Sequence, residues 1–132
     1  MAAVLWEETS VKTISIDFDG VIHSYTSPWT KADEIRDPPV PGAIQFLRDL
    51  VLSDQWDVCI FSTRNKEPQA IVAMQRYLLF HAIESPNNWV EKIRFPTEKP
   101  LAFIGIDDRV LTFTGKFPSF QELENFKPWN KK

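Results

Sequence analysis

The sequence has a single cysteine, Cys59, among its 132 residues. One thiol cannot form a disulfide within the chain, which fits a reducing compartment and a fold held by its core. Because Cys59 lies inside the apolar run 58–61, we expect a buried structural thiol rather than a nucleophile.

Long hydrophobic runs are also missing, since no segment approaches the ~20 apolar residues of a membrane span. The N-terminal residues include Glu7 and Glu8 and lack the apolar core of a signal peptide. We therefore expect a cytoplasmic protein with no membrane partner. The net charge of −3 provides no general attraction for nucleic acid but is compatible with a local basic groove.

The composition is that of one globular domain, with 43% hydrophobic and 25% charged residues over positions 1–132. Apolar patterns predict strands over 11–17, 56–61, 91–95 and 101–106. They also predict a helix starting near Pro41, a helix over 68–80 and a short C-terminal helix, for which Ser119 and Glu122 have capping-box spacing. Strands that alternate with helices indicate an α/β fold, in which helices cover both faces of a mainly parallel sheet.

Polar residues follow three of these strands at the point where each strand ends. Asp17 and Asp19 follow the first strand, residues 62–64 follow the second, and Asp107 and Asp108 follow the fourth. The carboxyl ends of parallel strands meet at one edge of the sheet, where such folds bind their ligands. We expect these side chains to form one site.

The acidic residues indicate a cation. Two carboxylates separated by one residue, such as Asp17 and Asp19, can bind a hard cation, act as nucleophile and acid, or cap a turn. The adjacent Asp107 and Asp108 repel each other, and they need a positive partner once they are buried beside Asp17. Mg²⁺ takes carboxylate and phosphate oxygens as ligands. Groups suited to holding phosphate oxygens are close in sequence: the hydroxyl of Ser62 or Thr63, and the cations Arg64 and Lys99.

Four short motifs, in order, resemble the signatures of the haloacid dehalogenase superfamily of phosphatases and phosphotransferases. They are DFDGV at Asp17, IFSTR at Ser62, the lysine of EKP at Lys99, and FIGIDD at Asp107 and Asp108. The resemblance spans about residues 13–108. It implies a three-layer Rossmann-like domain and a Mg²⁺-dependent phosphomonoester hydrolase that forms an aspartyl-phosphate intermediate.

The resemblance also implies roles for single residues. Asp17 attacks phosphorus, and Asp19 protonates the leaving oxygen and then activates water. Lys99 neutralises negative charge between Asp17 and the phosphate, and Lys92 is the alternative residue for this role. Phosphate binding is assigned to Ser62 or Thr63, Arg64 and Gly20, and Mg²⁺ binding to Asp17, the backbone carbonyl of Asp19 and Asp107. Asp108 binds the metal, orients a metal-bound water or pairs with Lys99.

The substrate is less defined. Residues 20–41 form a proline-rich excursion too short for a folded cap domain, so we expect a capless enzyme whose site is covered by a large substrate or by another subunit of a homo-oligomer. Tyr25 and Trp29 either stack on a base or pack the excursion onto the body. His23 either touches substrate or anchors the excursion.

The turn Ser62-Thr63-Arg64 resembles that in the phosphatase half of polynucleotide kinase-phosphatases, which favours a nucleotide or nucleic-acid end as substrate. Two alternatives to hydrolysis stay open: a phosphotransferase with the same site, and a non-catalytic phosphate-binding or regulatory module.

Overall fold

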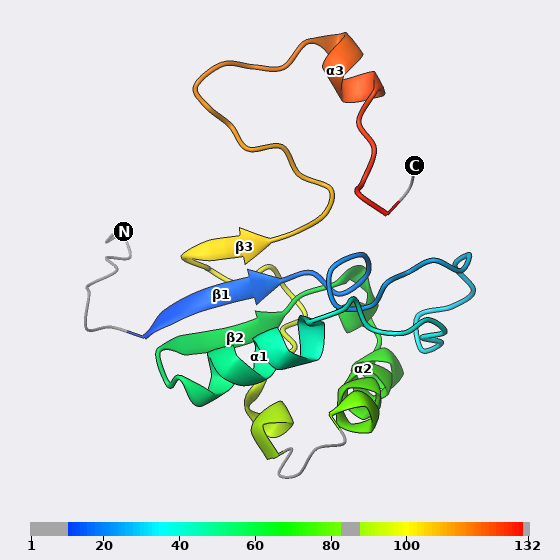
Figure 1. Ribbon diagram of the computed structural model, residues 1–132, viewed down its shortest axis with the longest axis vertical. Helices are drawn as coiled ribbons and strands as arrows, with labels where there is room; N and C mark the ends of the chain where they lie inside the picture. Colours follow the sequence, from blue (N-terminus) through cyan, green and yellow to red (C-terminus); the bar gives the residue numbers. More distant parts are fainter. Residues whose placement is uncertain (1–10, 83–87, 131–132) are drawn as a thin grey trace.

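The computed structural model describes residues 11–82 and 88–130 (Figure 1). Its strands, α-helices and short 3₁₀ helices follow one another in the order β1 Lys12–Ile16, α1 Ala43–Leu52, β2 Trp56–Ile60, η1 Thr63–Lys66, α2 Pro68–His81, η2 Asn88–Lys92, β3 Ile104–Ile106 and α3 Phe120–Glu124.

The three strands form one parallel sheet in the order β2-β1-β3. Ser15 of β1 is paired with Cys59 on one side and with Gly105 on the other. The α/β class and the parallel sheet were therefore predicted correctly. In Figure 1, α1 lies against β2, and α2 lies nearer the carboxyl ends of the strands.

The sheet has two unlike faces because side chains alternate along a strand. The even-numbered side chains of β1 and β2 (Ile14, Ile16, Val58 and Ile60) are buried in the main core with Leu47 of α1 and Met74 of α2. The odd-numbered face carries the small residues Cys59, Ser15 and Gly105 side by side. The first face therefore packs into the core and stabilises the fold, whereas the side chains of the second face are short and fill little space above the sheet.

The prediction of a strand over 91–95 was wrong. The structure has the 3₁₀ helix η2 there, followed by a single isolated bridge between Arg94 and Cys59. Trp89 and Val90 are adjacent and both buried. A helical turn can point two consecutive side chains into one core, whereas a strand would send them to opposite faces.

The strand predicted over 101–106 is shorter than expected, since only Ile104–Ile106 are in the sheet. Pro100 has no backbone N–H, and Leu101 and Phe103 are exposed at the sheet's edge. Helix α1 begins at Ala43 because Gly42 adopts a left-handed conformation with φ of 86°. Helix α2 agrees closely with its prediction, and the capping box of Ser119 and Glu122 is present at α3.

Residues 20–41 contain no helix or strand, in agreement with the predicted irregular excursion. After β3, the chain rises away from the sheet, forms α3 and returns to this excursion (Figure 1). On its return, Trp129 donates a hydrogen bond from Nε1 to the Gly20 carbonyl at 2.7 Å, and Asn130 donates one to the Ser24 carbonyl at 3.0 Å. None of the helices in the described ranges has the length and apolar character needed to cross a membrane.

Candidate active site

Three acidic side chains meet at the carboxyl edge of the sheet. Asp17 follows β1, and its backbone N–H donates to the Ile106 carbonyl at 2.9 Å, which places it beside Asp107 and Asp108 after β3. Carboxylate oxygens from the three residues lie within 4.8 Å of one another. The pairing of β1 with β3 thus brings together residues about ninety positions apart, as the sequence predicted.

This cluster is electrostatically unbalanced. Burial, the negative charge of Asp107 and the carboxyl of Asp108 together raise the pKa of Asp17 to about 8. Asp108 Oδ1 is buried and accepts no hydrogen bond from the described residues. A Cβ at Gly20, which has a φ of 84°, would overlap the Asp108 carboxylate, so a glycine is needed there on two counts.

Asp19 lies in the opposite environment. Arg64 makes a bidentate contact with its carboxylate, donating from Nε to Oδ2 at 2.9 Å and from Nη2 to Oδ1 at 3.0 Å. His23 Nδ1 lies 2.8 Å from Oδ1. Burial by itself would raise the pKa of Asp19, but the hydrogen bonds from His23 and Arg64 and the positive charge of Arg64 outweigh it and lower that pKa. The side chain of Asp19 is therefore directed at these partners, and its predicted metal contact rests on the backbone carbonyl.

His23 anchors the excursion and does not face a substrate, which corrects one of its two predicted roles. The side chain is 2% exposed. Its Nε2 accepts a hydrogen bond from the Asp37 backbone N–H at 3.1 Å, so Nδ1 carries the proton that it donates to Asp19. Asp37 in turn accepts a hydrogen bond from the Ser27 backbone N–H at 2.8 Å, which joins two parts of the excursion that lie 10 positions apart.

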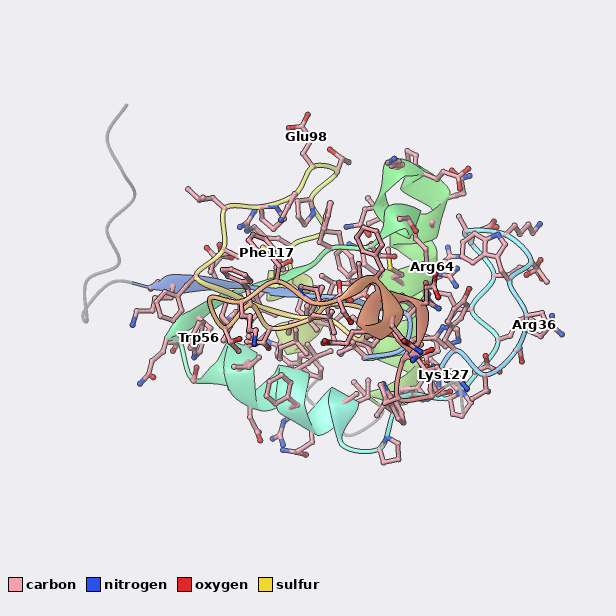
Figure 2. All side chains as sticks on the ribbon, turned by 90° about the horizontal axis from the view of Figure 1, so that it is seen from above. Arg36, Trp56, Arg64, Glu98, Phe117 and Lys127 are labelled. Atoms are coloured by element: carbon pink, nitrogen blue, oxygen red, sulfur yellow. The ribbon has the colours of Figure 1, made fainter. Side chains whose placement is uncertain are left out.

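Arg64 was predicted to bind phosphate, but its donors are directed elsewhere. The side chain is 2% exposed, and its Nη1 donates to the carbonyls of Ala32 at 2.7 Å and Glu34 at 3.1 Å. Figure 2 places it on the excursion side of the molecule. The ring of Trp29 lies 4.5 Å from its Cζ. Arg64 therefore joins the excursion to Asp19, and Trp29 covers it on one side.

The other predicted phosphate ligands differ in their accessibility. Ser62 is buried and caps η1, since its Oγ accepts from the Arg64 backbone N–H at 3.2 Å. Thr63, the alternative, is exposed. The Gly20 N–H donates to the His23 carbonyl at 2.8 Å and so is occupied within the loop, which does not support its predicted contact with phosphate.

One cavity of about 560 Å³ includes Asp17 and Asp107 in its lining together with Lys99. Lys92 is absent from that lining and belongs to η2, which packs against α1 and α2. This arrangement favours Lys99 as the cation of the site. Tyr25 and Trp29 are likewise absent from the described residues that line this cavity, which weakens their prediction as a stacking platform.

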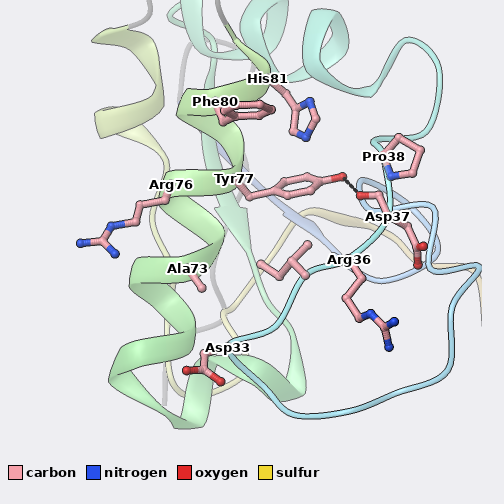
Figure 3. Close-up of a pocket in the computed structure, with 10 residues that line it drawn as sticks. Asp33, Arg36, Asp37, Pro38, Ala73, Arg76, Tyr77, Phe80 and His81 are labelled. Atoms are coloured by element: carbon pink, nitrogen blue, oxygen red, sulfur yellow. Dashed lines mark hydrogen bonds between the residues drawn. The ribbon is translucent and has the colours of Figure 1, made fainter.

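A second cavity of about 560 Å³ lies between the excursion and α2 (Figure 3). Tyr77 crosses it and donates its hydroxyl hydrogen to the Asp37 carbonyl at 2.8 Å. Figure 3 shows Arg36 and Arg76 pointing away from each other, so the cationic groups of this cavity do not converge on one point.

Sequence reasoning missed Asp37, Tyr77 and Trp129, which hold the excursion and the C-terminal segment around the site. Their contacts join residues between 14 and 109 positions apart, through His23, Asp37 and Gly20. The buried histidine was a usable signal, since it needed partners for both ring nitrogens. Nothing in the local sequence pattern marks Trp129.

Comparisons with models of known families, with curated proteins and with solved structures found no match to this chain.

Proposed function

We propose that this protein is a Mg²⁺-dependent phosphomonoester hydrolase of the haloacid dehalogenase type, which forms an aspartyl-phosphate on Asp17. The observation that carries the proposal is the convergence of Asp17, Asp107 and Asp108 at one sheet edge, beside a cavity that Lys99 also lines. The same proposal takes the sheet as the centre of a three-layer Rossmann-like domain.

The residues present fit the proposed metal. Hard carboxylate oxygens are the ligands that Mg²⁺ prefers, and the buried Asp108 Oδ1 needs a positive partner. Asp17, Asp107 and Asp108 would hold the ion. When bound, it would neutralise charge on the phosphoryl group.

A small number of residues carry out the steps of the proposed reaction. A carboxylate oxygen of Asp17 forms a bond to phosphorus while the bond from phosphorus to the ester oxygen breaks. Lys99 balances the negative charge of the phosphoryl oxygens, and Ser62 or Thr63 supplies a hydroxyl donor to one of them. The departing oxygen takes up a proton from solvent water and leaves as the alcohol. Water then attacks the phosphorus and frees Asp17 and inorganic phosphate.

The contacts of Asp19 also favour a second candidate, a phosphate-binding module that does not turn over. An acid catalyst must reach the leaving oxygen, and the carboxylate of Asp19 is engaged by Arg64 and His23. A phosphotransferase would use the same site as the hydrolase and differ in the acceptor that replaces water.

A phosphatase assay with Mg²⁺ separates these candidates, on a panel of nucleotides, sugar phosphates and phosphorylated oligonucleotide ends. Asp17→Asn should reduce turnover about 10³-fold or more, a loss of ~4 kcal/mol in transition-state stabilisation. Asp49→Asn removes an exposed carboxylate on α1 and should leave turnover unchanged. Near-normal turnover in folded Asp17→Asn would refute the proposal, and phosphate binding without turnover in the wild type would support the second candidate.

A further inference from the structure

The cavity beside Asp17 extends along the odd-numbered face of the sheet. Its floor includes Ser15 and Gly105, which are paired across β1 and β3. A hydroxymethyl group and a hydrogen atom fill little space above the backbone. The hollow therefore exists because small residues lie side by side on this face, while the other face carries isoleucine and valine.

The two ends of the cavity differ chemically. Asp17 and Asp107 lie at the carboxyl ends of the strands. Phe103 lies at the other end, where the Lys12 ammonium is 4.5 Å and the Trp56 ring 6.2 Å from its ring centroid. Asp107 is four positions after Phe103, so an extended chain between them measures about 13 Å. Figure 2 shows Trp56 at the opposite end of the molecule from Arg64.

The walls are mostly apolar. The apolar residues of the lining include Phe61, Pro100, Ala102, Ile104 and Val110. Lys99 is the cationic side chain among the described lining residues. A cavity of about 560 Å³ is in the range that holds a small organic molecule, and such a lining favours an apolar or aromatic group over a polyhydroxylated one.

We propose that this cavity binds the apolar, ring-bearing alcohol portion of the substrate, so that the enzyme acts on phosphomonoesters of aromatic or alicyclic alcohols. The inference rests on the proposed function, because it takes Asp17 as the nucleophile that attacks phosphorus. The ester oxygen leaves phosphorus with the bonding electrons, takes a proton and departs as the alcohol along the strand face.

Gly105 offers a direct way to fill the cavity. A Cβ at this position would meet the Ser15 carbonyl at 3.5 Å, an ordinary contact, and Gly105 has no left-handed conformation to preserve. Gly105→Val also suits a strand. The added side chain should lower kcat/KM for 1-naphthyl phosphate about 10- to 200-fold, the scale of one pocket methylene or more, and leave glycerol phosphate within about 2-fold.

Gly105→Ala is the second variant, with an intermediate loss expected, and it keeps the test decisive if valine disturbs folding. Phe117→Ala, an exposed position outside the cavity lining, is the matched control. Equal losses on both esters would overturn the inference, because the cavity would then be unrelated to the alcohol.

Binding of 1-naphthol, which contains no phosphorus, gives a readout independent of turnover. Fluorescence titration should show binding to the wild type and a loss of roughly 10-fold or more in affinity for Gly105→Val. Unchanged affinity in that variant would overturn the inference while leaving the proposed function intact. Cavity-dependent naphthol binding with no cleavage of any ester would overturn the proposed function and support the cavity as a ring-binding site.

Discussion

Asp17 and Asp19 lie two residues apart at the end of one strand, yet their surroundings are opposite. Asp17 has two further carboxyl groups beside it, and its pKa is raised to about 8. Asp19 has a buried arginine and a histidine, and its pKa is lowered. Strand β1 ends at Ile16, and the chain turns after Phe18, whose carbonyl accepts a hydrogen bond from the Ile22 backbone N–H at 2.9 Å. The alternation of a strand, which would place residues 17 and 19 on one side, therefore no longer applies to this pair.

The difference separates the interactions that hold the excursion to the fold from a cluster whose charges are left unbalanced. The Asp19 side is a saturated network in which Arg64 and His23 fasten the excursion to the sheet. The Asp17 side contains like charges and an unsatisfied oxygen, an arrangement that costs stability and that a cation would relieve. Four measurements test this contrast between the two aspartates.

The largest effect should follow from Arg64→Met. This change leaves the partly buried carboxylate of Asp19 without its arginine and removes the donors to the excursion carbonyls, so the free energy of unfolding should fall by about 3–5 kcal/mol. Arg94→Met is the matched control, because Arg94 pairs with Asp57 at 2.6 Å but is 52% exposed and should cost only about 0–1 kcal/mol. Urea denaturation measures both. Similar losses in the two variants would contradict the saturated network.

The next effect concerns the Asp17 side. Mg²⁺ at about 100 times its dissociation constant should raise the free energy of unfolding of the wild type by about 2.7 kcal/mol. Asp107→Asn should remove most of this gain, while Asp49→Asn on α1 should retain it. The readout is urea denaturation with and without EDTA. A gain that is the same in all three proteins would place the ion elsewhere.

A smaller effect should depend on pH. Burial would raise the pKa of Asp37, but the hydrogen bonds from Ser27 lower it below its ordinary value of 3.8. Its stabilising contribution is thus complete above that value and is lost as the pH falls through the lower, folded-state pKa. Asp37→Asn should cost about 1–3 kcal/mol at pH 7.

The gap between the wild type and Asp37→Asn should close as the solution is acidified below about pH 4. Asp33→Asn, an exposed carboxylate in the same excursion, should change little at either pH. A gap that is constant with pH would mean that the charge of Asp37 does not stabilise the excursion.

The smallest effect concerns the C-terminal segment. Trp129→Phe keeps an aromatic ring but loses the hydrogen bond to the Gly20 carbonyl, at a cost of about 0.5–1.5 kcal/mol in unfolding free energy. Phe117→Ala, which is 84% exposed, should cost less. If Trp129→Phe has no effect, the segment does not support the loop between Asp17 and His23.

Local patterns predicted much of the fold. The alternating and apolar runs marked β1 and β2, the helical spacing of apolar residues marked α2, and the capping box marked α3. The error at 91–95 arose because a short segment with few apolar residues is compatible with a strand or with a helical turn, and the packing of η2 against α1 and α2 decided between them. Sequence alone has no measure of that packing.

The candidate site divides in the same way. Parallel pairing brings strand ends together, so the meeting of Asp17 with Asp107 and Asp108 was predictable. The partners of Arg64 were not, because the three carbonyls that it reaches belong to an excursion with no regular structure. The position of a residue after a predicted strand identifies which residues lie at the carboxyl edge of the sheet. The direction of a long side chain depends instead on contacts with residues distant in sequence.

The central claim is that Asp17 carries the phosphoryl group, and covalent trapping tests it most directly. The wild-type protein is mixed with Mg²⁺ and a ³²P-labelled phosphomonoester that it cleaves, quenched in acid within milliseconds, digested and mapped by mass spectrometry. We predict label on the peptide that contains Asp17, and none on that peptide in Asp17→Asn. Label on another residue, or rapid turnover with no protein-bound phosphate at any quench time, would contradict the account.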